Sequence, residues 1–128
     1  CFHEAKHYAK ERVIFDKALS HYQLPQAKLV KMAQEITKAQ MLCIQLGRLK
    51  EAGTMKHQQV SLVKMNNCKM ALETAREARD MLGANGVIDE YPVIRHMLNL
   101  ESVNTYEGTV DIHRLVVGLE LTGDSAIR

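Results

Sequence analysis

Apolar residues recur along this chain at the spacing of one helical face, and the pattern predicts five helices. Positions three and four residues apart lie on the same side of an α-helix, so such spacing is typical of helices that bury one face. The pattern predicts helices over residues 2–15, 25–49 and 57–82, a fourth that begins at Pro92 and a fifth that begins at Thr109. No segment indicates a strand convincingly.

Residues with strong positional preferences mark the ends of these segments. Pro25 suits the first turn of a helix, where the N–H that proline lacks is not needed. Gly83 favours the end of the third helix, and Thr109 can cap the start of the fifth. Short connections between long amphipathic helices predict an all-α fold, an antiparallel up-and-down bundle of four to five helices, with residues 1–128 as one domain.

Composition narrows the classes of function. The chain has 128 residues, of which 46% are hydrophobic and 25% charged, as in an ordinary globular domain. The net charge of +2 comes from interspersed acids and bases with few aromatic residues, so we expect no nucleic-acid partner. No apolar run approaches the roughly 18 residues of a membrane span. Three cysteines without a Cys-x-x-Cys pair favour a reducing, intracellular compartment, and the missing initial Met suggests a fragment.

The segment His3-Glu4-Ala5-Lys6-His7 has the spacing of a zinc-binding helix, in which two histidines four residues apart share one face. A catalytic zinc needs a third protein ligand. Lys10 and Val13 stand where the longer form of the motif has glycine and histidine. We therefore favour two solvated histidines and predict no metal site.

The segment Thr105-Tyr106-Glu107-Gly108-Thr109 presents a carboxylate on a short turn ahead of an apolar helix. One interpretation is a solvated acid near a helix N-terminus, where the helix dipole favours negative charge. The other is a general base, which would have to be shielded from water to gain basicity. The spacing alone favours the solvated acid.

Two other segments leave a similar choice open. Arg12 and Phe15 place a cation and an aromatic ring near a helix end, which suits a phosphate and a flat ring. A surface arginine beside a core phenylalanine is the commoner arrangement. The turn Gly83-Ala84-Asn85-Gly86 could bring backbone N–H groups to a ligand, or could only end the third helix.

Together these motifs resemble the C-terminal helical domain of the acyl-CoA dehydrogenases, and most of all the glutaryl-CoA type, over nearly the whole chain. The segments that carry the resemblance are Arg12-x-x-Phe15, Gln23-Leu24-x-Gln26-x-Lys28-Leu29, Gln45-Leu46-Gly47-Arg48-Leu49-Lys50, Asn66-Asn67-Cys68, Ala78-Arg79-Asp80-Met81-Leu82-Gly83-x-Asn85-Gly86, Asp89-Glu90-Tyr91, Ile94-Arg95-His96 and Asn99-Leu100-Glu101-x-Val103-Asn104-Thr105-Tyr106-Glu107-Gly108-Thr109-x-Asp111-Ile112-His113.

The resemblance implies FAD-dependent oxidation of an acyl-CoA thioester between its α and β carbons. Glu107 would remove the α-proton while a hydride leaves the β-carbon for the flavin, and Gly108 would leave room for the thioester substrate. Arg12 and Gln23 would contact FAD held mainly by a neighbouring subunit, and the turn 80–84 would cover it. The cofactor-binding residues implied are Arg12, Phe15, Gln23, Asp80, Met81, Leu82, Gly83, Ala84, Thr109 and Asp111.

For the parent enzyme, the resemblance implies oxidative decarboxylation of glutaryl-CoA to crotonyl-CoA within lysine and tryptophan catabolism. Electrons would pass to electron-transfer flavoprotein in the mitochondrial matrix, and the enzyme would be a homodimer or homotetramer. The family's N-terminal helical domain and middle β-domain are not in this sequence, so the chain alone is expected to be inactive.

Two alternatives stay open beside that expectation. One is a related acyl-CoA dehydrogenase for a monocarboxylic acyl-CoA, and the other is a non-catalytic helical assembly module. Three positions depart from the family pattern: Asp16 and Ala84 stand where glycine is usual, and Val110 stands where the glutaryl type has histidine. Asp16 adds a negative charge near Arg12, which would weaken the attraction for a diphosphate.

Overall fold

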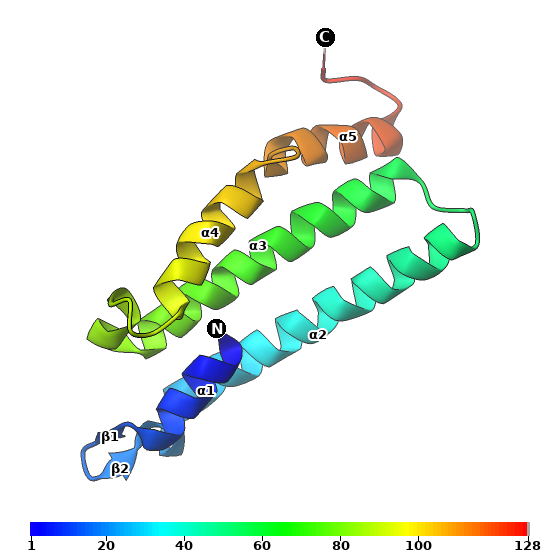
Figure 1. The fold of residues 1–128 in the computed structure, drawn as a ribbon. Coiled ribbons are helices and arrows are strands. Elements are labelled where there is room, and N and C mark those ends of the chain that lie inside the picture. Colours follow the sequence, from blue (N-terminus) through cyan, green and yellow to red (C-terminus); the bar gives the residue numbers. More distant parts are fainter. Residues whose placement is uncertain (128) are drawn as a thin grey trace.

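The chain folds around one long central helix, as a computed structural model of residues 1–127 shows (Figure 1). The elements are α1 Phe2–Glu11, β1 Val13–Ile14, β2 Lys17–Ala18, the 3₁₀ turn η1 Leu19–His21, α2 Gln23–Glu51, α3 His57–Met81, the 3₁₀ turn η2 Gly83–Val87, α4 Val93–Thr105 and α5 Val110–Thr122. The first four helices alternate in direction along the bundle (Figure 1). The predicted all-α up-and-down architecture is confirmed.

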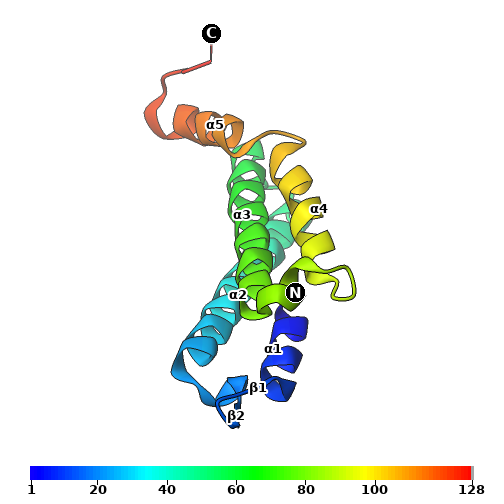
Figure 2. The ribbon, with the colours of Figure 1, turned by 90° about the vertical axis from the view of Figure 1, so that its left-hand side faces the viewer.

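Helix α3 organises the molecule, because α1, α2, α4 and α5 all pack against it. Figure 2 shows the α4–α5 connection near one end of the bundle and the β1–β2 hairpin at the other. The main core cluster lies where α1, α2, α3 and the start of α4 meet, and it consists of Ala5, Ala9, Met32, Ala78, Met81, Leu82 and Val93. Alanines at these contacts allow the helix backbones to approach closely.

The predicted first helix, residues 2–15, is wrong at its C-terminal end. Helix α1 ends at Glu11, and β1 and β2 then pair antiparallel with Ile14 opposite Lys17. The two residues between the strands, Phe15 and Asp16, have left-handed φ values of 47° and 63°. Positive φ at both central positions is the signature of a type I′ hairpin turn. The sequence prediction also missed these strands, because strands of two residues are too short to show an alternating pattern.

The hairpin changes the surroundings predicted for Phe15. Its side chain is 86% exposed, so it is not the core phenylalanine that the apolar spacing favoured. Asp16 adopts a conformation that glycine takes freely and aspartate tolerates, which gives a physical reason for the glycine usual at this position in the resembling family. The Tyr22 hydroxyl donates a hydrogen bond of 2.7 Å to the Ile14 carbonyl and ties the hairpin to the start of α2.

The other predicted helix ends agree closely with the structure. Helix α2 begins two residues before Pro25, which is its third residue. Gly83 follows the end of α3 with a left-handed φ of 59°, as a C-terminal stop requires. The Thr109 hydroxyl accepts a hydrogen bond of 3.4 Å from the Ile112 N–H and caps α5. Over residues 1–127, no helix combines the length and the hydropathy needed to cross a bilayer.

Candidate functional site

The Glu107 turn connects α4 to α5 by a strained piece of backbone. Tyr106 ends α4, Thr109 caps α5, and between them Glu107 and Gly108 have left-handed φ values of 54° and 97°. A left-handed conformation costs a residue other than glycine about 1 kcal/mol. The Glu107 side chain is exposed in this chain. The turn thus projects a carboxylate from a defined point between two helices.

Two side chains from other parts of the fold contact this turn. Lys64 on α3 donates a hydrogen bond of 2.8 Å from its ammonium group to the Gly108 carbonyl. The imidazole of His113, on the first turn of α5, lies against the Gly108 Cα. A Cβ atom at position 108 would come within 2.9 Å of His113 Nε2, so any larger residue would force this ring to shift. Sequence patterns did not single out Lys64 or His113 for this role.

The same region contains buried polar atoms without hydrogen bonds. Asn104, in the last turn of α4, buries its side-chain oxygen, and His113 buries both ring nitrogens. None of these three atoms finds a hydrogen-bond partner among residues 1–127. Such atoms are few in native proteins, because each costs desolvation free energy. Each of the two helices that flank Glu107 therefore has buried side-chain atoms whose hydrogen-bonding capacity is unused within residues 1–127.

A second group of predicted site residues meets at the hairpin end of the bundle. A pocket of about 280 Å³ forms between α1, the hairpin and the end of α3. Its lining residues are Tyr8, Arg12, Ile14, Leu19, Asp80, Met81, Leu82, Gly83, Ala84 and Asn85. Arg12 supplies a fixed cation, and η2 supplies the backbone of a tight turn. This donor set fits a phosphate group of a dinucleotide such as FAD.

The turn on one side of this pocket is fixed by packing. A Cβ atom at Gly86 would lie 2.1 Å from the Arg79 carbonyl oxygen, so the η2 backbone lies directly on the last turn of α3. The Asn85 amide donates a hydrogen bond of 3.2 Å to the Tyr8 hydroxyl on α1. Tyr8 also makes an edge-to-face contact with Tyr91, with ring centroids 5.8 Å apart. The pocket walls are thus joined by direct contacts.

Asp80 is engaged by Lys28, which belongs to a sequence motif but was given no role there. The Lys28 ammonium donates a hydrogen bond to the Asp80 carboxylate and lies 3.4 Å from a Glu77 carboxylate oxygen. The hydrogen bond to Asp80 raises the pKa of Lys28 above its usual value. The same bond, with the charge attraction, lowers the pKa of Asp80. This contact joins α2 to the end of α3 at the edge of the pocket.

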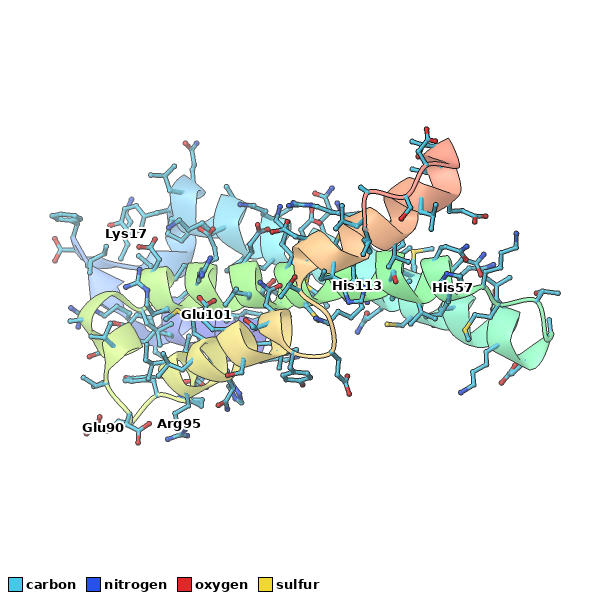
Figure 3. The ribbon with its side chains drawn as sticks, turned by 90° about the horizontal axis from the view of Figure 1, so that it is seen from above. Lys17, His57, Glu90, Arg95, Glu101 and His113 are labelled. Atoms are coloured by element: carbon cyan, nitrogen blue, oxygen red, sulfur yellow. The ribbon has the colours of Figure 1, made fainter. Side chains whose placement is uncertain are left out.

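The predicted site residues therefore separate into two groups along α3. Arg12, Phe15, Gln23 and residues 80–84 lie at the hairpin end, whereas residues 107–111 lie by Lys64. From Lys64 to Asp80 the helix rises about 24 Å, at 1.5 Å for each residue. Figure 3 shows the same separation between the labelled Lys17 of the hairpin and His113 of α5. One chain does not bring both groups to one place.

The zinc-like segment on α1 shows a different arrangement from a metal site. His7 Nε2 lies 3.3 Å from a carboxylate oxygen of Glu11, one turn later on an exposed face. His3 is also exposed. Residues 1–127 contain no cluster of three histidine, cysteine or acidic side chains placed to hold a metal ion.

Comparison with known proteins identifies the family to which this arrangement belongs. A family model described as "Acyl-CoA dehydrogenase, C-terminal domain" matches residues 1–122. The chain belongs to the acyl-CoA dehydrogenase family. The acyl-CoA dehydrogenases are oxidoreductases that use FAD.

Structures of glutaryl-CoA dehydrogenase from Mycobacterium smegmatis resemble this acyl-CoA dehydrogenase domain closely. One is 49% identical with a TM-score of 0.97, and it covers 100% of this chain and 33% of its own. Another, in complex with FADH2, is 46% identical with a TM-score of 0.96, covering 99% of this chain and 33% of its own. The resemblance inferred from the sequence motifs is confirmed at the level of the family and domain.

Curated relatives extend the family to short-chain enzymes. The short-chain specific acyl-CoA dehydrogenase of Megasphaera elsdenii is 31% identical over 90% of this chain and 30% of its own length. The mitochondrial short-chain specific acyl-CoA dehydrogenase of Homo sapiens is 30% identical over 88% of this chain and 27% of its own length. The chain thus spans about a third of its relatives, which include both bacterial and mitochondrial proteins.

Proposed function

We propose that this chain supplies the catalytic base and part of the FAD-binding surface of an enzyme that oxidises glutaryl-CoA. The observation that carries the proposal is the Glu107 turn, a strained connection that projects one carboxylate at the position of the family's base. The 49% identity to a glutaryl-CoA dehydrogenase supports glutaryl-CoA over other acyl chains.

The proposed reaction begins with proton transfer to Glu107. Its carboxylate takes the α-proton of the thioester, and the electron pair of that C–H bond forms the new α,β double bond. FAD, when bound, would accept the hydride that leaves the β-carbon, which completes a two-electron oxidation. With glutaryl-CoA, the distal carboxylate then leaves as CO₂, and a proton replaces it to give crotonyl-CoA. Electron-transfer flavoprotein would reoxidise the enzyme.

The geometry of the turn suits a base that must be placed accurately. Gly108 adopts the left-handed backbone of this turn without strain, and the His113 ring lies beside it, so the direction in which the Glu107 carboxylate projects is defined. The backbone N–H of Glu107 is available to donate to the thioester oxygen, where negative charge develops as the proton leaves. Burial of the exposed Glu107 carboxylate by the rest of the enzyme and by substrate would strengthen it as a base.

The separation along α3 supports a site shared between subunits. Thr109 and Asp111 would contact the FAD beside Glu107 of the same chain. Arg12, Gln23 and Phe15, about 24 Å along α3, would contact FAD in a neighbouring subunit, beside the turn 80–84. Exposed apolar side chains on α2, such as Met41 and Ile44 at 65% and 56% exposure, give this assembly surface to bury.

A second candidate substrate is a monocarboxylic acyl-CoA. The short-chain specific relatives, at 30% and 31% identity, favour it. Such a reaction would end at the α,β-unsaturated thioester, without release of CO₂. The mitochondrial relative supports a location in the mitochondrial matrix, and the bacterial relatives support the same chemistry without an organelle.

The proposal is tested with the complete polypeptide that carries this chain. Anaerobic addition of glutaryl-CoA should bleach the flavin absorbance, and Glu107→Gln should slow bleaching by about 10³-fold or more, because amide nitrogen and oxygen cannot accept the proton. Glu51→Gln, at an exposed acid ending α2, is the control and should bleach at the wild-type rate. Bleaching by butyryl-CoA alone would support the monocarboxylic substrate. The absence of bleaching with both thioesters would overturn the proposed dehydrogenase activity.

A further inference from the structure

Lys64 is a half-buried lysine that uses its ammonium group on a backbone carbonyl. Its hydrogen bond of 2.8 Å to the Gly108 carbonyl joins α3 to a turn 44 residues later in the chain. Within residues 1–127 this ammonium forms no ion pair. By contrast, Lys28 on α2, Lys56 at the start of α3 and Lys69 on α3 each pair with an acidic side chain. Partly burying a charge without an opposite charge is unfavourable. Its placement therefore points to a role at the turn.

His113 supports the same turn through the shape of its ring. The Nε2 and Cε1 atoms would lie 2.9 Å and 3.0 Å from a Cβ at position 108, so the ring edge fills the space beside the Gly108 Cα. Both ring nitrogens are buried without partners among residues 1–127. The ring therefore contributes to the turn by its shape and not by hydrogen bonds. Here the ring lies one turn from the base.

We infer that Lys64 and His113 are positioning residues that fix the Glu107–Gly108 turn, an inference that rests on the proposed role of Glu107. Left-handed backbone at a residue other than glycine, here Glu107, persists only when its surroundings determine it. Lys64 fixes the carbonyl on one side of Gly108, and His113 blocks movement of its Cα on the other. Without them the turn would relax, and a displacement of about 1 Å can slow a positioned reaction about 10²-fold.

The role of Lys64 is tested in the complete polypeptide with three variants. Lys64→Met removes the donor and should slow flavin bleaching at saturating acyl-CoA about ten- to a hundredfold, with little change in the half-saturating concentration. Lys64→Arg keeps a donor and should recover most of the rate. Lys69→Met is the matched control, because Lys69 lies on the same helix and only pairs with Glu73 at the surface, so its rate should stay within about twofold.

The role of His113 is tested by separating ring shape from ring polarity. His113→Phe keeps a flat ring beside Gly108 and should stay within about threefold of the wild-type rate, whereas His113→Ala should lose about tenfold or more. Equal losses in the two variants would overturn the supporting role of the ring. A loss in Lys64→Met no larger than in Lys69→Met, or no recovery in Lys64→Arg, would overturn the role of Lys64.

A second measurement separates local positioning from general stability. Amide hydrogen exchange should become faster at residues 105–110 in Lys64→Met and His113→Ala, with flavin content and exchange in the core around Met32 unchanged. Faster exchange throughout, with flavin loss, would mean a merely structural role and would overturn the inference. If no acyl-CoA bleaches the wild-type flavin, the proposed function fails, while the exchange experiment still decides whether these residues fix the turn.

Discussion

At some positions in this domain, close contact between two backbone segments determines which residue can fit. Gly86 is the clearest case, because it is buried and η2 rests on the last turn of α3 at this point. Its φ is not left-handed, so conformational freedom does not explain it. The space does: a methyl group there would overlap the Arg79 carbonyl oxygen, which belongs to the helix backbone and cannot move aside.

Replacing Gly86 with alanine should destabilise the domain by about 2–3 kcal/mol, because backbone atoms must shift to admit the methyl group. Gly47→Ala is the matched control. It lies inside α2 with no atom within 4 Å of its added Cβ, so alanine should raise stability by about 0.5–1 kcal/mol. Equilibrium unfolding in urea measures both changes. A Gly86→Ala variant as stable as the wild type would show that η2 can lift from α3.

At the scale of elements, the contact between α2 and α3 depends in part on charge. Lys28 is held between Asp80 and Glu77, with the pKa of Lys28 raised and that of Asp80 lowered. A lowered acid pKa gives stability that is present above the unfolded value and is lost as the pH falls through the folded value. A raised lysine pKa gives stability that is lost as the pH rises through its folded value.

Lys28→Met should therefore lower the free energy of unfolding most between about pH 5 and pH 9, where Lys28 and Asp80 are both charged. The side chains of Lys28 and Asp80 are 34% and 54% exposed, so solvent screening keeps the loss to about 0.5–1 kcal/mol. Unfolding free energies at pH 3 and pH 7 check this, and the gap between variant and wild type should narrow at pH 3. Lys38→Met, which removes a contact within α2 only, should show a smaller gap at both pH values.

Helix periodicity predicted the five helices, yet it could not predict the β1–β2 hairpin. Proline, glycine and threonine at helix ends act locally, so Pro92, Gly83 and Thr109 identified those ends from the sequence. The turn at Phe15 and Asp16 lacks the Asn-Gly or Asp-Gly pair that usually marks a hairpin. The contacts of Gly108 with Lys64 and His113 were missed for another reason, since periodicity gives a residue's face and not its neighbour on a distant helix.

For the whole molecule, the length of α3 sets the distance between the two groups of proposed site residues. The family resemblance implied that Arg12 contacts FAD held mainly by a neighbouring subunit, but the distance between Arg12 and Glu107 along the bundle follows only from packing. The two groups are about 24 Å apart along α3 within one chain. If each proposed site takes Glu107 from one subunit and Arg12 from its neighbour, the sites of an oligomer are hybrids.

Mixing two inactive variants of the complete polypeptide should then restore activity. Arg12→Ala and Glu107→Gln subunits that exchange at random would form mixed dimers, in which one of the two sites has both native residues. About a quarter of all sites would recover, as measured by flavin bleaching after co-refolding or co-expression. Each variant mixed with itself is the control. If mixtures that contain mixed dimers show no recovery, Arg12 and Glu107 of one subunit contribute to the same site.

The left-handed backbone at Glu107 has a consequence for selection on this protein. Glycine would relieve about 1 kcal/mol of strain there, so the residue proposed to perform the chemistry is not the one the fold prefers. A library screened only for thermal tolerance should therefore accumulate glycine at position 107. Ranking such variants by heat resistance would enrich chains that have lost the base.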